Sequence, residues 1–482
     1  MRCLPLSLLS ALAARLLGGL ATPIAPHWDR MRVRHAWDAV PENWENLGHP
    51  PHATTIDLHL ALKSHNENAL IDALYEVSDP KSLKYVSPLP IRTRVYPPVP
   101  LSRHRYGAHL SKEQVAELVA PHPDTLELVN SWLEHHGVSS SSVSTTLGGN
   151  WLTVVGVSVP QANDILGASY QLYQHAETSD TVLRTISYSL PEALHGHVET
   201  VVPTTYFGSS LSSGKRPRMR PGAAAVARAN AGSGSLVTAL SSREEVITPS
   251  YLRLLYHTLG YEPAATDRNV LGIAGYLGQF PSPQDLTIFM HEFRTDGDDA
   301  TFTVVQINGG SYDPDQSKLK AGKEANLDIQ YTQSITYPTP HIYYSIGTGT
   351  TPGVVIDPYL SWFKYVLELA SIPQTILTSY GSLEHNVPPD YAVRICDLFA
   401  QLGARGVSVL FASGDRGVGE GKCLIPDSSG HVRFQFVPEF PASCTCGVFF
   451  CLQALHKHKY KSLTIPPRFR RSVCHYRWRH YE

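Results

Sequence analysis

The stretch "QTILTSYGSLEHNVPPDYAVRICDLFAQLGARGVSVLFASGD", residues 374–415, decides the fold. Two short apolar runs, "TILT" and "VSVLF", flank the helical stretch "PDYAVRICDLFAQLG". Buried strands that alternate with helices are typical of a parallel sheet with crossover helices. The runs "VLGIAGYL" and "ATFTVVQI" and the helical stretch "DPYLSWFKYVLELA" show the same alternation nearer the N-terminus. We therefore expect an α/β domain over residues 244–444.

Polar residues follow directly on two of these expected strands. "SYG" comes after "TILT", and "SGD" comes after "VSVLFA". Functional sites of parallel α/β folds lie at the carboxyl ends of the strands. The sequence therefore places any chemistry of this domain near these two tripeptides.

A pair of carboxylates stands in "GKEANLDIQY", residues 322–331. Glu324 and Asp328 are four positions apart, so they share one face of a helix. Most such pairs belong to a solvated acidic face, where like charges cost a few tenths of a kcal/mol. The alternative is a pair whose pKa values are pushed apart for proton transfer. The spacing alone leaves both interpretations open.

The residues before the α/β domain predict a separate α+β unit, residues 22–206. "TIDLHLALKSHNENALIDALYEVSDP" reads as a strand that leads into an amphipathic helix, and "NWLTVVGVSVPQANDILGA" reads as a strand followed by a helix. Two helices lie between them: Ser111 and Gln114 form a capping box at the first, and Gly137 ends the second. Residues 207–243 are rich in Gly, Ser, Ala and Arg and predict a linker.

Length and charge narrow the class of protein. The 482 residues predict two or three domains, and 42% hydrophobic with 17% charged residues indicates a globular chain. A formal net charge of −2 gives no basic field for nucleic acid. Residues 1–21 read as a secretory signal, and no later stretch has the roughly 18 apolar residues of a membrane helix. We expect a secreted, extracellular protein without nucleic-acid or membrane partners.

The cysteines gather late in the chain. Of seven, one is Cys3 and the other six lie from Cys396 onward. Their pairing cannot be read from the sequence. A zinc site from Cys444, Cys446, His456 and His458 stays open as an alternative, although this spacing matches no established zinc pattern.

The blocks "EANLDIQY", "SYGSLEHNVPPDYA" and "GARGVSVLFASGDRGVG" resemble the sedolisin (serine-carboxyl) peptidases, in particular their fungal tripeptidyl-peptidase-like branch. "VPENW", "LYEVSDPKSLKY" and "YGAHLSKEQVAEL" resemble the pro-kumamolisin-type activation prodomain of the same enzymes. The resemblance runs from about residue 37 to 443. It implies a subtilisin-like catalytic domain, peptide or protein substrates, and a prodomain that acts as an intramolecular inhibitor.

The resemblance also implies roles for three carboxylates. Glu324 would be the general base that takes the proton of a serine nucleophile, and Asp328 would orient and polarise Glu324. Asp415 would donate a hydrogen bond to the oxyanion, which it can do only while protonated. Chemistry that depends on a carboxylate base and a protonated carboxyl suits acid conditions.

Two parts of the family pattern are not found in this sequence. The family's serine nucleophile lies in a Gly-Thr-Ser motif, and these 482 residues contain no such tripeptide. The family's calcium site is also missing. Residues 445–482 form a basic tail and residues 86–105 a proline-rich insert, neither of which resembles the family. We interpret both as translated intron or shifted reading frame, and expect the catalytic domain to be incomplete.

These observations favour a precursor of a secreted, acid-acting serine-carboxyl peptidase that releases tripeptides from peptide N-termini. The chain as written is expected to be inactive, because Glu324 has no serine to deprotonate. An alternative is a non-catalytic inhibitor or binding protein of related peptidases, based on the prodomain. A nucleic-acid-binding tail is a third interpretation, which predicts salt-sensitive retention on DNA.

Overall fold

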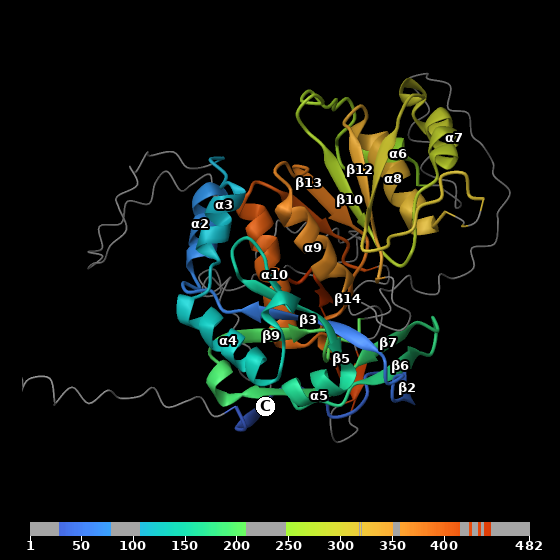
Figure 1. Cartoon of the computed structure of the whole chain (residues 1–482). Coiled ribbons are helices and arrows are strands. Elements are labelled where there is room, and N and C mark those ends of the chain that lie inside the picture. Colours follow the sequence, from blue (N-terminus) through green and yellow to red (C-terminus); the bar gives the residue numbers. More distant parts are fainter. Residues whose placement is uncertain are drawn as a thin grey trace, which may run out of the picture.

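The computed structural model describes residues 28–78, 107–208, 247–317, 319, 321–349, 357–414, 424–426, 432–434 and 438–444 (Figure 1). The predicted signal at 1–21, the insert at 86–105, nearly all of the linker at 207–243 and the tail at 445–482 lie outside these residues. We call residues 28–208 the N-terminal unit and residues 247–444 the C-terminal unit. In Figure 1 the N-terminal unit (blue to green) lies below the C-terminal unit (yellow to orange).

The N-terminal unit is built on a four-stranded antiparallel sheet in the order β4-β5-β3-β9. Its strands are β3 (Thr55–Leu62), β4 (Val143–Thr145), β5 (Trp151–Ser158) and β9 (Val198–Val202). Two smaller antiparallel sheets extend it, β1 (Met31–Ala36) with β8 (Ser187–Pro191), and β2 (Trp44–Gly48), β6 (Gln171–His175) and β7 (Thr181–Arg184) in the order β2-β6-β7.

The helices of this unit begin and end where the sequence indicates. They are α2 (Ala69–Ser78), α3 (Lys112–Leu118), α4 (Pro123–His135) and α5 (Val159–Leu166). Ser111 caps α3, and its side chain and that of Gln114 form the expected capping box. Gly137, with φ +73°, follows the end of α4 and takes the left-handed conformation that glycine tolerates.

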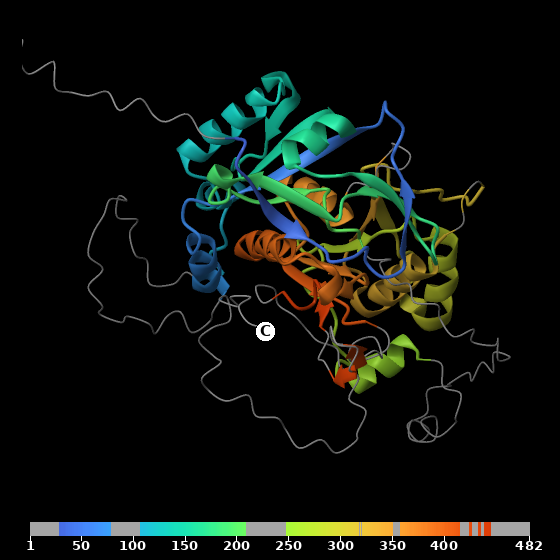
Figure 2. The same cartoon turned by 90° about the horizontal axis from the view of Figure 1, so that it is seen from below.

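The side chains of strand β3 pack on both faces of its sheet. Leu58, Leu60 and Leu62 pack into a core with α4 and α5. Between them, His59 and Ala61 point to the opposite face, where Lys364 and the core of the C-terminal unit lie. Successive side chains of a strand face opposite sides of the sheet, which explains this division. Figure 2 shows the resulting layers of helices, antiparallel sheet and helices of the C-terminal unit.

The end of the N-terminal unit lies slightly beyond the boundary that the sequence suggested. Phe207 was assigned to the linker, yet it is 4% exposed. Its ring contacts Trp44 and Tyr173 at centroid distances of 5.7 and 4.8 Å. The packed unit therefore includes Phe207, because an aromatic ring buries too much apolar surface to stay in a solvated linker.

The C-terminal unit contains a five-stranded parallel sheet in the order β11-β12-β10-β13-β15. Its strands are β10 (Leu271–Gly275), β11 (Phe302–Ile307), β12 (His341–Ile346), β13 (Thr375–Thr378) and β15 (Ser408–Phe411). The predicted parallel sheet is confirmed, and four of its strands match the expected apolar runs. Strand β12, "HIYYSI", was not predicted, although its aromatic and β-branched residues between Pro340 and Gly347 are typical of a strand.

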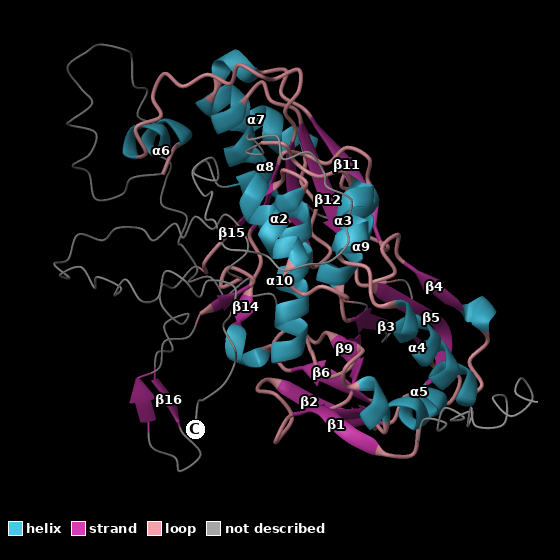
Figure 3. Cartoon of the chain, turned by 90° about the vertical axis from the view of Figure 1, so that its left-hand side faces the viewer, coloured by secondary structure: helices cyan, strands magenta, loops and turns pink. Residues whose placement is uncertain are grey.

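Helices cover both faces of this sheet (Figure 3). They are α7 (Pro283–Phe293), α8 (Lys323–Thr336), α9 (Pro358–Glu368) and α10 (Pro389–Ala404). Helix α6 (Pro249–Leu255) contacts α8 and lies away from the sheet (Figure 3). Met290 of α7 and Ile329 of α8 pack with Ile273 on one face. On the other face, Phe363 of α9 packs with Ile376 and shares a core with residues of α10. Helices α9 and α10 therefore lie between the parallel sheet and the N-terminal unit.

Two short pairings and a disulfide bond hold the last described residues. β14 (Ser382–Leu383) pairs antiparallel with β18 (Glu439–Phe440), and β16 (Leu424–Pro426) pairs with β17 (Val432–Phe434). Cys396 of α10 is bonded to Cys444, with an S–S distance of 2.01 Å. A disulfide sulfur is no longer a thiolate ligand, so the alternative zinc site loses Cys444. None of the helices in the described ranges is long and apolar enough to span a bilayer.

Candidate active site

Helix α8 carries both carboxylates of the expected pair. Its first turn begins after Gly322, where the Glu324 backbone N–H donates to Gln279 Oε1 at 3.0 Å. Ala325 and Ile329 turn into the apolar core and fix the rotation of the helix. Asp328 is 6% exposed and Glu324 is half-buried. A solvated acidic face would leave both carboxylates exposed, and the burial of Asp328 argues against that interpretation.

Asp328 is bound by a serine from the end of a neighbouring strand. Ser379 comes directly after β13, and its hydroxyl donates to Asp328 Oδ1 at 2.6 Å. This contact brings together the "SYG" tripeptide and the carboxylate pair, which lie 51 residues apart in the sequence. The carboxyl end of β13 thus meets helix α8, at the edge of the sheet where sites of parallel α/β folds lie. That chemistry takes place there stays a prediction.

The pKa of a buried tyrosine is affected by the charges of both carboxylates. Tyr343 of β12 is 0% exposed, and its hydroxyl donates to the Gln279 carbonyl at 3.3 Å. Burial is the main cause that raises the pKa of the Tyr343 hydroxyl well above its usual value. The charges of Asp328 and Glu324 raise the same pKa further. The spacing of four residues within α8 places the two carboxylates on the same side of that helix.

Further aromatic rings line the interior beneath this pair. The rings of Tyr276 and Tyr380 meet edge to face at a centroid distance of 5.2 Å. The Tyr380 hydroxyl donates to the Tyr276 carbonyl at 3.3 Å. Because Tyr380 follows Ser379, this packing holds the strand end that supplies the hydroxyl to Asp328. An apolar, rigid base of this kind keeps water from one side of the carboxylates and restricts their positions.

Asp415, the third expected carboxylate, lies outside the described residues. The described chain reaches Gly414, and β15 ends at Phe411. Phe411 stands opposite Thr378 in the parallel register, so the chains after β13 and β15 leave the sheet at the same edge. The role of Asp415 at the oxyanion stays a prediction, as do the roles of Glu324 and Asp328.

Three residues of this site were not named from the sequence. Ser379 was noted only as part of a tripeptide after a strand, and Gln279 and Tyr343 were not considered. The position of Ser379 directly after a buried strand was the available signal. Gln279 lies in a turn and Tyr343 in a strand that the sequence analysis missed, so neither gave a local sign of its role.

No metal site is found in the parts of the chain that the structure describes. No group of three or more His, Cys, Asp or Glu side chains there is arranged to hold an ion. The absence of the family's calcium site from the whole sequence stays a prediction.

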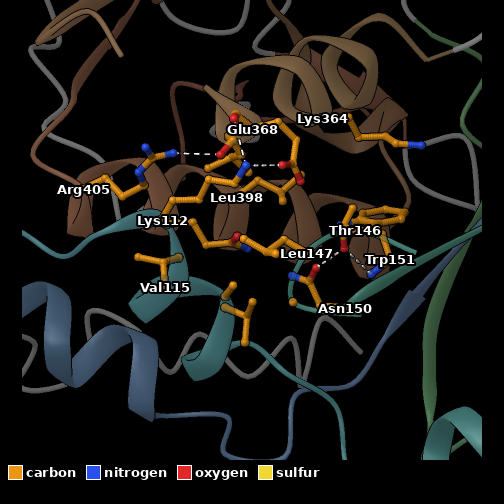
Figure 4. A pocket seen from close by; sticks show the side chains of 15 residues that line it. Lys112, Val115, Thr146, Leu147, Asn150, Trp151, Lys364, Glu368, Leu398 and Arg405 are labelled. Atoms are coloured by element: carbon orange, nitrogen blue, oxygen red, sulfur yellow. Dashed lines mark hydrogen bonds and ion pairs between the residues drawn. The ribbon is translucent and has the colours of Figure 1, made fainter. Parts of the chain in front are cut away.

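A pocket lies away from the carboxylate pair, between the two units (Figure 4). Its volume is about 50 Å³, which is space for very few water molecules. Lys112 of α3 forms an ion pair with Glu368 of α9 across it. Arg405 donates to the carbonyls of Leu367 and Leu369 at 2.8 and 2.7 Å. The Lys112–Glu368 pair joins the two units, whereas the Arg405 contacts lie within the C-terminal unit. The pocket is lined by residues of both units and is part of their interface.

Buried polar contacts join the two units next to this pocket. Arg394 of α10 is 2% exposed; it bonds to Glu199 Oε2 at 3.3 Å and donates to the Asn150 carbonyl at 3.0 Å. Its guanidinium carbon lies 5.4 Å from the ring centre of Trp151. At the end of the N-terminal unit, Tyr206 stacks on a tyrosine of α10 at a centroid distance of 4.3 Å. The N-terminal unit is therefore docked on α9 and α10 through specific charged and aromatic contacts.

Asp397, near Arg394 on α10, has a carboxyl group with an unusually high pKa. Burial raises the pKa of Asp397 on α10 to about 7. The positive charge of Arg394 lowers this pKa, and the negative charges of Glu199 and Glu67 raise it. Asp397 is therefore largely protonated in acid, where its neutral form suits the buried interface.

Comparison with known proteins identifies the N-terminal unit. The family described as "Pro-kumamolisin, activation domain" matches residues 42–98 and 100–207. Among solved structures, Pseudomonas sedolisin (serine-carboxyl proteinase) complexed with two molecules of pseudo-iodotyrostatin is similar at 18% identity and a TM-score of 0.31, over 43% of this chain and 54% of that chain.

Curated relatives match most of the chain. The tripeptidyl-peptidase SED2 of Arthroderma otae is 30% identical over 451 residues, which cover 89% of this chain and 68% of the relative. A probable tripeptidyl-peptidase SED3 of Arthroderma benhamiae is 32% identical over 419 residues, or 84% of this chain and 64% of the relative. The matched length includes both units and the helix with Glu324 and Asp328. The chain therefore belongs to the sedolisin, or serine-carboxyl peptidase, family.

Proposed function

We propose that this chain is the precursor of a secreted, acid-acting serine-carboxyl peptidase that releases tripeptides from peptide N-termini. The observation that carries the proposal is the pairing on α8: Asp328 is buried one helical turn after Glu324, and Ser379 donates a hydrogen bond to Asp328. Tripeptide release is proposed from the names of the relatives, and secretion from the signal-like residues 1–21.

In the proposed reaction, Glu324 takes the proton of a serine hydroxyl as its oxygen bonds to the scissile carbonyl carbon. Glu324 then passes this proton to the leaving amine as the peptide bond breaks. Asp328 holds Glu324 in place and stabilises its protonated form. Asp415, while protonated, donates to the oxyanion of the tetrahedral intermediate. A carboxylate base and a protonated carboxyl donor work together only in acid, so we expect activity to fall toward neutral pH.

The serine in this scheme is the one in the family's Gly-Thr-Ser motif, which these 482 residues do not contain. We therefore propose that the polypeptide as written does not turn over peptides. A protein that also carries the Gly-Thr-Ser segment is expected to be active. We expect its calcium ion to accompany that segment, in keeping with the family.

The N-terminal unit is proposed to act as an intramolecular inhibitor. Its docking on α9 and α10 through Arg394, Glu199 and Trp151 supports this role. These contacts would hold the unit in place before maturation.

The test compares the 482-residue chain with a chimera in which residues 1–443 are joined to the C-terminal part of the SED2 relative. Release from an Ala-Ala-Phe reporter is measured from pH 3 to 7. We expect release in acid by the processed chimera only. Glu324→Gln in the chimera should reduce turnover by roughly 10⁴- to 10⁶-fold, as for other members of a protease triad.

The control for this substitution is Glu292→Gln, at an exposed carboxylate near the end of the neighbouring helix α7. It should leave turnover unchanged. A chimera that folds but releases nothing at any pH would overturn the peptidase proposal. Turnover by the 482-residue chain itself would overturn the proposed need for the missing serine.

A second candidate function is inhibition of related peptidases by the N-terminal unit. The observation that favours it is the core between β3, β5, α4 and α5, which among the described residues contains only side chains of this unit. A unit with its own core can dock on another catalytic domain. The 482-residue chain would then inhibit an active relative without hydrolysing the reporter, whereas the precursor proposal predicts no inhibition in trans.

A further inference from the structure

The hydroxyl of Ser379 makes a short contact with one carboxylate of the pair. The distance of 2.6 Å from Ser379 Oγ to Asp328 Oδ1 is in the range of charge-assisted O–H···O⁻ hydrogen bonds. Asp328 is buried, whereas Glu324, one helical turn earlier, is half-buried. The hydroxyl therefore acts on the carboxylate that has less contact with water.

Two carboxylates in one site do not ionise independently. The first proton to bind goes to the carboxylate whose anion is less stabilised by its surroundings. A donated hydroxyl hydrogen bond stabilises the anion of Asp328. Burial acts in the opposite direction on the same residue, so without this bond the proton would favour Asp328. The Ser379 hydroxyl offsets the burial.

Three tyrosines from three strands are the other titratable groups to consider. The charges of both carboxylates act on Tyr343 of β12, whose pKa is raised mainly by burial, so it stays neutral over the whole acid range. Its hydroxyl donates to the Gln279 carbonyl. Tyr380, which follows β13, and Tyr276, which follows β10, also lie near Tyr343 and are uncharged in acid.

We infer that Ser379 is a positioning residue: its hydroxyl keeps the negative charge on Asp328 and leaves the exchangeable proton to Glu324. This inference rests on the proposed function, in which Glu324 must accept and release a proton while Asp328 stays ionised to stabilise it. Removing the hydroxyl would let Asp328 take up the proton, and Glu324 would then remain ionised to lower pH.

The test measures which carboxyl group is protonated and needs no turnover. The full chain is treated with a water-soluble diazoacetamide, which esterifies protonated carboxyl groups, at a series of pH values. Peptide mass spectrometry then locates the ester on Glu324 or Asp328. In Ser379→Ala, we expect the pH midpoint for Glu324 esterification to fall by about one unit, which is a tenfold change in proton affinity.

Three variants control for structural effects. Ser379→Thr keeps the hydroxyl and should restore the midpoint. Ser382→Ala removes a buried hydroxyl from β14, three residues further on, and should leave the midpoint unchanged. If Ser379→Ala does not fold, Ser379→Cys keeps the volume with a weaker donor and should lower the midpoint by a smaller amount.

An unchanged midpoint in a folded Ser379→Ala or Ser379→Cys protein would overturn the inference, as would an equal shift in Ser382→Ala. This test can succeed or fail independently of the proposed peptidase function. A shifted midpoint together with an inactive chimera would leave the role of Ser379 in place and remove the peptidase proposal. An active chimera with an unchanged midpoint would do the reverse.

Discussion

The N-terminal unit and the C-terminal unit complete their cores in different ways. In the described part of the chain, the main core of the N-terminal unit contains its own side chains alone. The main core of the C-terminal unit also includes four residues of the N-terminal unit: Ala61, Trp151, Val202 and Tyr206. The main core of the C-terminal unit therefore depends on the N-terminal unit for part of its packing. The N-terminal unit depends on the C-terminal unit in a smaller core, where α2 and α3 pack on Ala400 and Ala404 of α10.

The type of sheet explains this asymmetry. Every residue of β10 is buried, because helices cover both faces of a parallel sheet. Strand β3 belongs to an antiparallel sheet with one face on its own helices, and its other face carries His59 and Ala61 toward the C-terminal unit. An antiparallel sheet can form a core with one face and leave the other for docking.

The largest expected effect comes from two tryptophans that are fully buried in the two units. Trp132 of α4 and Trp362 of α9 are each 0% exposed. Replacing either by Ala should cost about 3–5 kcal/mol, because each leaves a large cavity. Hydrogen exchange read separately for the two units should show that Trp132→Ala loosens both units, whereas Trp362→Ala loosens mainly the C-terminal unit. Equal loosening of the N-terminal unit by both variants would contradict the asymmetry.

The second-largest effect is expected from the disulfide bond, which is present in the C-terminal unit and has no counterpart in residues 28–208. Residues 28–208 contain no cysteine, and Cys396–Cys444 closes a loop of 48 residues in the C-terminal unit. Cys396→Ser with Cys444→Ser should cost about 2–4 kcal/mol, since the unfolded chain gains conformational freedom. Urea unfolding with and without reductant measures the loss. Hydrogen exchange in the N-terminal unit should increase only where that unit contacts α10. An equal loss of protection throughout both units would contradict the difference proposed between them.

Acid is expected to weaken the contact between the units at His59. Burial, and then the charge of Lys364, lower the pKa of His59 to about 3. The unfolded chain binds this proton near pH 6.5, so the stability due to neutral His59 is present above pH 6.5 and is lost as the pH falls toward 3. His59→Gln should remove this loss, about 1.4 kcal/mol per pH unit between pH 6 and 4.

Urea unfolding curves from pH 4 to 7 measure this pH-dependent loss of stability. His65→Gln is the matched control, because His65 is exposed. It should leave the pH dependence unchanged. Asp397 has the opposite effect on the pH dependence of stability. Because its pKa is raised in the folded protein, its contribution to the free energy of unfolding declines as the pH rises from about 4 to 7. A His59→Gln protein with the same acid loss as the original chain would show that His59 is not the source.

The smallest expected effect concerns the cap of α3. Ser111→Ala removes the hydroxyl that accepts from the Gln114 backbone N–H, which should cost about 1 kcal/mol. Helix α3 carries Lys112, which pairs with Glu368 of α9, so the loss should appear at the edge of the contact between units. Thermal unfolding and local hydrogen exchange measure it. Ser139→Ala, at the cap of a short 3₁₀ turn, is the control and should cost less.

The sequence alone determined the features that depend on neighbours along the chain. Short apolar runs predicted the parallel strands β10, β11, β13 and β15, and cap residues predicted the start of α3 and the end of α4. Spacing placed Glu324 and Asp328 on one face of a helix. The reason is physical: strand alternation, helical repeat and capping all act over a few residues, so a local pattern contains the needed information.

Contacts between distant segments were decided only by the tertiary structure. Three contacts join residues far apart in the chain: the hydrogen bond from Ser379 to Asp328, the hydrogen bond from Tyr343 to the Gln279 carbonyl, and the disulfide between Cys396 and Cys444. The second face of β3 became an interface because α9 and α10 pack there. Such contacts depend on how whole elements pack together, and no pattern within one segment specifies its partner in another.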